Sequence, residues 1–344
     1  MAWAVPENPR ADVNRAGKRA LDGLGDDFLE YLDALSAINN WRASHAFPLN
    51  TFQVNLRRKG RLLDEECLVA QRIKRLTSIQ HKLERFPNMK LSQMQDIGGC
   101  RAILRDVKRV RKLVDDFKTS DIKHKLASED DYISSPKVSG YRGIHLVYRY
   151  YSDRKETYND LKIEIQIRSQ LQHAWATSVE VVGTLLRQAL KSSQGEDEWL
   201  QFFKLMGTAL AIEEGCDPVP NTPASEKQLR SDIRQLAKTL RPVARLENYG
   251  KAIQVIETSS QKAKYYLLEL RPSAERLSIT GFIESANKMA SDAYLTVERS
   301  LDAKSGDEAV LVSVDSIDAL RKAYPNYFLA PTRDAPGCLK VAIL

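Results

Sequence analysis

Residues 161–169, which read LKIEIQIRS, determine how the rest of the chain is interpreted. Isoleucines alternate with polar residues along this segment, and a period of two predicts a β-strand with one buried face. The other face carries four polar side chains, Lys162, Glu164, Gln166 and Arg168. A carboxylate, an amide and a guanidinium in one row are unusual on an ordinary solvated face. The row is the first indication of a site for phosphoryl transfer.

Composition is that of a globular protein with room for two domains. The chain has 344 residues, 43% of them apolar, and no apolar run as long as a membrane span. Its start has no apolar stretch of signal-peptide type, and its four cysteines lack the paired spacing of a zinc site. We therefore expect a cytoplasmic protein with reduced thiols. The net charge of +7 and the pI near 9.1 favour anionic partners, weakly.

Hydrophobic periodicity predicts an α+β chain, with a mixed sheet flanked by helices. Apolar residues at helical spacing predict a first helix over 28–41, and a second helix is expected over 64–85, ended by Pro87. Strands are then expected over 98–105, 144–151 and 161–167, with helices over 107–117 and 171–190.

Residues 215–227, GCDPVPNTPASEK, are rich in proline and turn formers and mark a domain boundary. Beyond them we expect strands in 251–257, 264–272, 275–282, 308–314 and 338–344, with helices over 284–301 and 316–324. This gives an N-terminal helical segment over 1–60, a catalytic domain over 61–214, a linker over 215–235 and a small α/β domain over 236–344. The last is expected to be regulatory or sensing.

The first chemical feature is RIKRLTSIQHK, residues 72–82. Arg72, Arg75, Ile79 and Lys82 recur every three or four residues, and Lys74 and Ser78 lie alongside. On a helix the cations among them can converge on a polyphosphate. The alternative is a solvated basic helix face. The second feature is MQDIGGCR, residues 94–101, in which Asp96 precedes a glycine pair and a strand. Asp96 can hold Mg²⁺ there, or be a turn aspartate with the glycines marking a β-bulge.

The third feature is PKVSGYRGIH, residues 136–145. An exposed Tyr141 on this loop can stack on a base, while Lys137, Arg142 and His145 can meet phosphate. The alternative is a hairpin entry with a half-buried tyrosine. The fourth is Glu164, which can serve as a general base or share a metal with Asp96, or be an ordinary ion-paired strand residue.

In this order the segments resemble the synthetase domain of the RelA/SpoT-type alarmone synthetases. The resemblance rests on RIKRLTSIQHK, MQDIGGCRAI, DYISSPKVSGYRGIH, IEIQIRS and LQHAWA, and covers about residues 60–190. It implies a fold similar to nucleotidyltransferases, a mixed sheet flanked by helices. It also implies a transferase that moves the β,γ-pyrophosphate of ATP to the 3′-hydroxyl of an acceptor nucleotide, with Mg²⁺ as cofactor.

The resemblance also assigns roles by position. Asp96 and Glu164 would be the catalytic residues and the metal ligands, with Glu164 activating the 3′-hydroxyl or helping to hold the metal. The ATP-binding residues would be Arg72, Lys74, Ser78, Lys82 and Arg101. The acceptor-binding residues would be Lys137, Tyr141, Arg142, His145, Gln166 and Arg168.

The acceptor is where this chain departs from the family pattern. The family usually has lysine where Asp130 stands, asparagine at Ser139 and serine at Gly143. Asp130 would repel the 5′-phosphates of GDP or GTP. In addition, none of the five histidines has the adjacent aspartate of the family's hydrolase, so no pyrophosphohydrolase activity is expected.

Four functions follow from these observations. The leading one makes a guanosine alarmone, (p)ppGpp, from ATP and GDP or GTP. An alternative is a toxin that pyrophosphorylates the 3′ CCA end of tRNA and is controlled by the C-terminal domain, in phage defence or as a toxin–antitoxin pair, with a protein regulator as partner. A third is an inactive nucleotide-binding regulatory module. The last is a generic basic RNA-binding protein. For the tRNA alternative, the basic clusters at 57–61 and 108–112 could touch an RNA backbone, or be solvated faces.

Overall fold

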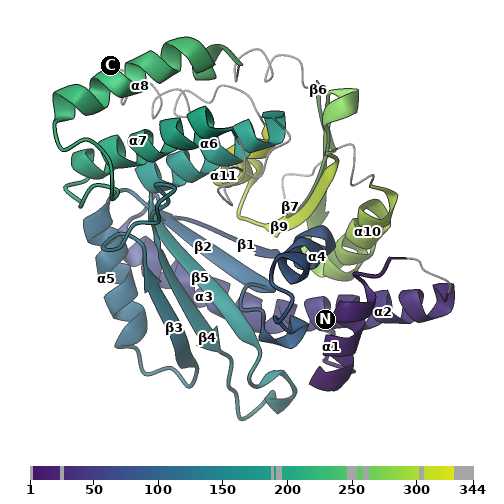
Figure 1. Cartoon of the computed structure of the whole chain (residues 1–344). Helices are drawn as coiled ribbons and strands as arrows, with labels where there is room; N and C mark the ends of the chain where they lie inside the picture. Colours follow the sequence, from purple (N-terminus) through teal and green to yellow (C-terminus); the bar gives the residue numbers. More distant parts are fainter. Residues whose placement is uncertain are drawn as a thin grey trace.

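The computed structural model describes residues 3–23, 27–186, 190, 196–245, 254–258, 263–301 and 306–328. Within these ranges one mixed sheet runs through the molecule in the order β3-β4-β5-β2-β1-β9-β7-β8-β6 (Figure 1). The strands are β1 Leu68–Ile73, β2 Gly98–Leu104, β3 Lys125–Asp131, β4 Ile144–Arg149, β5 Lys162–Ser169, β6 Gln254–Thr258, β7 Ala263–Arg271, β8 Arg276–Ile283 and β9 Glu308–Ser313.

Helices flank this sheet, so the predicted α+β class is confirmed. The helices are α1 Arg10–Arg19, α2 Phe28–Ser44, α3 Ala46–Leu63, α4 Leu76–Arg85, α5 Val107–Lys118, α6 Gln170–Leu186, α7 Asp197–Glu213, α8 Glu226–Leu240, α10 Asn287–Ser300, α11 Ile317–Ala323 and α12 Pro325–Phe328. Figure 1 shows α3 behind the strands and α6, α7 and α8 stacked beyond one end of them. None of the helices in the described ranges has the length and apolar character needed to cross a membrane.

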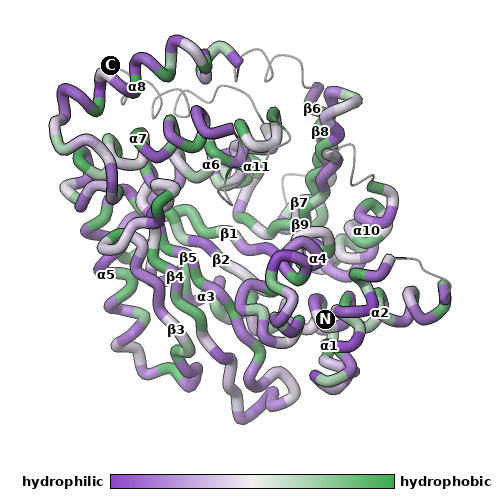
Figure 2. Tube along the Cα trace, in the orientation of Figure 1, coloured by the Kyte–Doolittle hydropathy of each residue, from purple (hydrophilic) through white to green (hydrophobic). Residues whose placement is uncertain are grey.

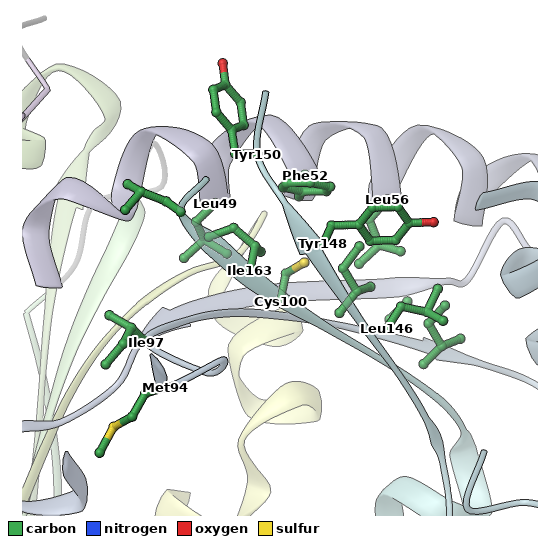
Figure 3. Packing of buried hydrophobic residues seen from close by; sticks show 14 of the residues in the cluster. Leu49, Phe52, Leu56, Met94, Ile97, Cys100, Leu146, Tyr148, Tyr150 and Ile163 are labelled. Carbon is green, nitrogen blue, oxygen red and sulfur yellow. The ribbon is translucent and has the colours of Figure 1, made fainter. Parts of the chain in front are cut away.

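The main core lies between α3 and the central strands (Figure 3). Leu49, Phe52 and Leu56 recur along one face of α3 and are almost fully buried. They meet the inward face of the sheet, to which β5 contributes its isoleucines, such as Ile163, with no exposed surface. The alternation in β5 therefore directs its polar row to the opposite face, as the sequence predicts. In Figure 2, where each residue is coloured by hydropathy, outer helices such as α8 carry both hydrophobic and hydrophilic residues along their length.

The predicted helix over 64–85 was wrong in its first half. Residues Leu68–Ile73 form β1, which pairs with β2 on one side and with β9 on the other, and only Leu76–Arg85 is helical. The helical spacing of the cations was misleading, because two of them, Arg72 and Arg75, precede α4. Strand pairing on both edges provides hydrogen-bond partners for the backbone of β1. The stabilisation from these tertiary contacts outweighs the local preference for a helix.

Other elements agree with the sequence in part. The predicted strands at 98–105, 144–151 and 161–167 are β2, β4 and β5, and the predicted helices at 28–41, 107–117 and 171–190 are α2, α5 and α6. Six further elements were not predicted, namely α1, α3, β3, α7, α8 and α12. In the expected linker, helix α8 begins at Glu226.

The C-terminal segment, which comprises the described residues between 254 and 328, adds strands to the sheet that β1 to β5 form. Strand β9 pairs with β1 through Gln71 opposite Ser313 and Arg72 opposite Val312, and β7, β8 and β6 follow outward. The predicted strands before residue 315 and the two predicted helices correspond to β6, β7, β8, β9, α10 and α11. The strand predicted at 338–344 lies outside the described residues. The C-terminal segment is therefore joined to β1, the strand that carries Arg72.

Candidate active site

Asp96 lies in the turn between a short 3-10 helix, Leu91–Gln93, and β2. Its two carboxylate oxygens accept hydrogen bonds from Lys74 Nζ at 2.7 Å and Lys82 Nζ at 2.9 Å. Burial alone would raise the pKa of Asp96, but the charges of the two lysines outweigh it and lower that pKa. Asp96 is therefore an ionised carboxylate between two cations.

Glu164 projects from β5 on the polar face. It accepts hydrogen bonds from His145 Nδ1 at 2.9 Å and from Gln166 Nε2 at 2.7 Å. Burial would raise the pKa of Glu164, but these hydrogen bonds and the charge of Lys74 lower it to about 2. A carboxylate this acidic is poorly matched to removing a proton near pH 7 and well suited to holding a cation.

The two carboxylates are close enough for the charge of one to act on the other. Glu164 sits opposite Gly99 in the parallel pairing of β5 with β2, just after the turn that carries Asp96. The charge of Glu164 raises the pKa of Asp96, and both carboxylates feel the charge of Lys74. Two carboxylates of this kind fit Mg²⁺, which is commonly held by one or two carboxylates together with substrate phosphates.

A hydrogen-bonded chain connects Glu164 to the acceptor side of the candidate site. Arg168 Nη2 donates to the Tyr141 hydroxyl at 2.7 Å, and that hydroxyl contacts His145 Nε2. Because Nδ1 of His145 donates to Glu164, its Nε2 is free to accept the tyrosine proton. A second route runs from Arg168 through Gln166 to the same carboxylate. Four predicted acceptor-side residues are thus in one network that ends on Glu164.

Tyr141 differs from expectation. The two expectations were an exposed ring and a half-buried one, but only 6% of its surface is accessible, and it lies in an aromatic cluster with Tyr132 and Trp175. Lys137 Nζ lies 4.2 Å from the centre of the Tyr132 ring and 5.3 Å from that of Tyr141. Tyr132 was not predicted, although it stands in the quoted segment DYISSPKVSGYRGIH. A single tyrosine next to Asp131 belongs to no sequence pattern that would mark it as a site residue.

Arg142 is not part of this network. Its buried guanidinium donates to the backbone carbonyls of Ile133, at 3.0 Å, and Asp217. It therefore ties the loop to the segment after α7. Gly140 has φ of +96°, and a side chain on Gly207 of α7 would come within 2.8 Å of the Gly140 backbone. The loop is thus packed closely against α7, and both positions require glycine.

Arg72 and Arg101 lie beside each other on β1 and β2, and the C-terminal segment covers them. The Tyr324 ring centre is 5.5 Å from Cζ of Arg101, and Arg101 Nη1 donates to the Ala323 carbonyl at 3.4 Å. Burial alone would lower the pKa of Arg72, but the nearby Tyr324, with Glu180, holds it above its usual value. Helix α11 packs on β1, and α12 packs on α6.

His173 of α6 is held by the same segment, because its Nε2 donates to the Lys322 carbonyl at 3.1 Å. Burial holds the pKa of His173 well below its usual value, so this histidine is neutral. Ser78 lies on the first turn of α4, the helix that also carries Lys82. The covering by Tyr324 was not predicted, because nothing in the local pattern around AYPNY connects it to β1 and β2.

The basic clusters at 57–61 and 108–112 are largely paired with acidic residues. Arg57 and Arg61 contact Asp315 at 3.3 and 2.7 Å, and Lys112 contacts Asp116 at 2.9 Å. Arg111 is paired with Asp131. The side chains of these clusters form ion pairs with other residues of the same chain. The contacts therefore provide no support for an RNA-binding role.

A mixed sheet that presents a carboxylate pair among lysines and arginines is typical of centres that handle nucleotide phosphates. Residues 71–181 match the model of a family described as "Region found in RelA / SpoT proteins". The chain therefore carries the region found in RelA and SpoT proteins, and every predicted site residue lies inside it.

Known relatives share this region. The GTP pyrophosphokinase YjbM of Bacillus subtilis (strain 168) is 33% identical over 114 residues, which cover 32% of this chain and 52% of that protein. The chain thus spans about half the length of this curated relative. Among solved structures, the small alarmone synthetase 1 of Bacillus subtilis with its product pppGpp matches with TM-score 0.43 and 24% identity, over 52% of this chain and 95% of that one. A GTP pyrophosphokinase family protein of Streptococcus pneumoniae matches with TM-score 0.42 and 22% identity, over 63% and 98%.

Proposed function

We propose that this protein is an ATP-dependent pyrophosphotransferase that moves the β,γ-pyrophosphate of ATP to the 3′-hydroxyl of GDP or GTP. The observation that carries the proposal is the carboxylate pair of Asp96 and Glu164, with Lys74 and Lys82 on Asp96, inside the RelA/SpoT region. The relative whose name records a GTP pyrophosphokinase supports the choice of acceptor. No hydrolase activity is proposed.

Asp96 and Glu164 would hold Mg²⁺, which would neutralise charge on the phosphate oxygens as the β-phosphorus is attacked. Lys74 and Lys82 now neutralise Asp96, and they become available to ATP phosphates once that carboxylate has another cation. Ser78 lies on the same helix as Lys82, within one turn of its start. The work of the protein is then mostly positioning and electrostatic stabilisation.

Glu164 acts in this scheme mainly as a fixed anionic ligand. The network from Arg168 through Tyr141 and His145 orients it and keeps it ionised. Its pKa of about 2 makes it a weak base for the 3′-hydroxyl. Activation of the acceptor then depends on the metal and on the alignment of the hydroxyl rather than on proton removal by Glu164.

The acceptor base would lie against Tyr132 and Lys137, at the accessible edge of the cluster around the buried Tyr141. An aromatic ring and an ammonium group suit a purine. One observation favours a second candidate acceptor, the 3′ end of tRNA. Asp130 lies opposite His145 in the β3–β4 pairing, and its charge acts on Lys137. A carboxylate there repels the 5′-phosphates of GDP or GTP, whereas a terminal adenosine of RNA carries no 5′-polyphosphate.

A direct assay separates the two acceptors. The full chain is incubated with Mg²⁺ and ATP labelled in its γ-phosphate, together with GDP, GTP or deacylated tRNA. Label in the guanosine nucleotides supports the proposal, and label in tRNA alone replaces it with the second candidate. Glu164→Gln and Asp96→Asn serve as inactive controls, with Glu156→Gln as a control for an exposed carboxylate.

We also propose that the C-terminal segment restrains the enzyme. Two of the proposed ATP-binding residues, Arg72 and Arg101, are covered by the α11–α12 turn in this structure. ATP that uses these guanidinium groups must displace Tyr324. The remaining hypothesis, an inactive regulatory module, gains if variants of Asp96 and Glu164 leave every effect of the protein unchanged. A protein regulator that moves this segment is a further part of the proposal.

A further inference from the structure

A buried ion pair joins the N-terminal helix α2 to the C-terminal helix α10. Arg42 donates to both carboxylate oxygens of Glu298, at 2.8 and 3.1 Å, and the two side chains are only 3% and 7% exposed. Tyr294, one turn earlier on α10, accepts from Arg42 at 2.9 Å and donates to Glu298. Charges this deeply buried are tolerated only where the surrounding hydrogen bonds are complete, so other partners of the pair are informative.

Those other partners lie in the turn between β1 and α4. Glu298 Oε1 accepts from the backbone N–H of Leu76 at 2.9 Å, and Arg42 Nε donates to the carbonyl of Lys74 at 2.9 Å. Leu76 is the first residue of α4, and the residue before it, Arg75, gives the helix no side-chain cap. The first N–H groups of a helix need an acceptor from elsewhere. A carboxylate from α10, 222 residues away in sequence, supplies one.

A second acidic residue of the C-terminal segment holds the same turn. Arg75 is paired with Glu308 of β9 at 2.7 Å, next to the β1–β9 pairing. Three contacts thus fix the turn from Lys74 to Leu76. The Lys74 carbonyl accepts from Arg42, the Arg75 side chain pairs with Glu308, and the Leu76 amide donates to Glu298. Lys74 is the first residue of this turn and Lys82 lies further along α4, and both of these cations contact Asp96.

We propose that Glu298 is a positioning residue for the ATP side of the site. By capping α4 it fixes Lys82 and, with Arg42, Lys74 in relation to Asp96. The inference rests on the proposed function in one respect, the use of these lysines for ATP. It also means that the C-terminal segment has two separable effects. Tyr324 covers the arginines, whereas Glu298 keeps the lysines in place.

The test compares Glu298→Ala, Glu298→Asp and Glu298→Gln in the full chain. Alanine removes the acceptor, aspartate keeps the charge but is one methylene too short, and glutamine keeps an oxygen that can still accept from Leu76. Asp292→Ala, an exposed carboxylate of the same helix paired with Lys288, is the matched control. Circular dichroism and thermal unfolding report whether each variant is folded, and the aspartate and glutamine variants keep the test valid if the alanine variant does not fold.

Hydrogen exchange over residues 74–82 is the first readout, because it needs no nucleotide. Loss of the cap should speed exchange of the first α4 amides about tenfold in Glu298→Asp and Glu298→Ala, but much less in Glu298→Gln. This factor corresponds to about 1.4 kcal/mol, which lies within the range typical of a helix cap. Exchange over 74–82 that is unchanged in both the aspartate and alanine variants, or equally faster in Asp292→Ala, would overturn the inference.

The second readout is the affinity for a non-hydrolysable ATP analogue with Mg²⁺, measured without acceptor in the Tyr324→Ala background. We expect it to fall about tenfold in Glu298→Ala and to recover in Glu298→Gln, with the same pattern in the KM for ATP and little change in kcat. A structural role alone would lower thermal stability and kcat without this split, and would contradict the inference. If analogue affinity depends on Glu298 but no acceptor is labelled, positioning stands and the transfer proposal fails.

Discussion

At the scale of single residues, the acidity of Glu164 is the property with the clearest consequences. Its pKa of about 2 lies below the ordinary value for glutamate, because the hydrogen bonds of His145 and Gln166 and the charge of Lys74 outweigh burial. The folded protein thus binds this proton less readily than the unfolded chain does. Glu164 stabilises the fold above its ordinary pKa, near 4.5, and this contribution is lost as the pH falls toward 2.

Glu164→Gln should therefore reduce the dependence of unfolding free energy on pH between about 4.5 and 2. The shift corresponds to a contribution of about 3 kcal/mol at neutral pH. Chemical denaturation of wild type and variant across this range is the measurement. Glu156→Gln, at an exposed carboxylate, is the control and should leave the curve unchanged. Equal slopes for wild type and Glu164→Gln would show that the carboxylate is not held as the structure describes.

Asp96 gives a second prediction at this scale. Asp96→Asn removes the charge that now occupies Lys74 and Lys82, so both ammonium groups should attract ATP phosphates more strongly. Transfer should fall by about 10²–10⁴-fold, while binding of metal-free ATP should be maintained or improved. Labelled-ATP transfer and calorimetry measure the two effects. Weaker binding together with full transfer would exclude Asp96 from the site.

At the scale of elements, the acceptor loop depends on its contact with α7. A Cβ atom on Gly207 would lie 2.8 Å from the backbone of Gly140, which itself has a positive φ. The loop carries Tyr141 and the helix carries Phe203, whose carbonyl accepts from Trp175 at 2.9 Å. Helix α7 lies outside the matched residues 71–181, so the position of the proposed base-binding cluster depends on a helix that the family match does not cover.

Gly207→Ala should destabilise the protein by about 1–3 kcal/mol, because two backbones cannot separate without moving the loop. The same change should raise the KM for the acceptor more than that for ATP, since the displaced loop carries Tyr141 and Lys137. Gln201→Ala, at an exposed position of α7, is the control. Urea unfolding and initial rates with each substrate are the measurements. A variant as stable as wild type would mean that α7 and the loop are not in contact.

At the scale of the whole molecule, the C-terminal segment is built into the catalytic sheet rather than attached by a flexible joint. It contributes β9 beside β1, Glu298 beneath α4 and Tyr324 over Arg101. Deleting the segment would remove the cover and the support together. Its removal is thus a poor way to measure restraint, and single substitutions are required.

Tyr324→Ala should raise transfer activity by at least about tenfold, because it uncovers Arg101 and Arg72 without touching Glu298. Tyr324→Phe keeps the ring over Arg101 and should behave like wild type, which makes it the matched control. Initial rates at low ATP concentration are the most sensitive measurement. Identical rates for the alanine variant and wild type would show that the covering tyrosine does not limit ATP binding.

Local pattern accounts for much of the catalytic segment. The alternation in residues 161–169 predicted β5 and its polar face, because burial on one side of a strand leaves a period that can be read directly. The same reasoning failed for β1. Its cations have helical spacing, and only the partners on both of its edges make it a strand.

The amino-acid order alone was enough to recognise the RelA/SpoT region and to propose Asp96, Glu164 and two lysines as site residues. Folding in three dimensions was needed to bring Tyr324 onto Arg101, Glu298 onto Leu76 and β9 onto β1. The physical reason is the distance along the chain. Contacts within an element repeat with its geometry, whereas a contact between residues more than 200 positions apart leaves no period in either segment.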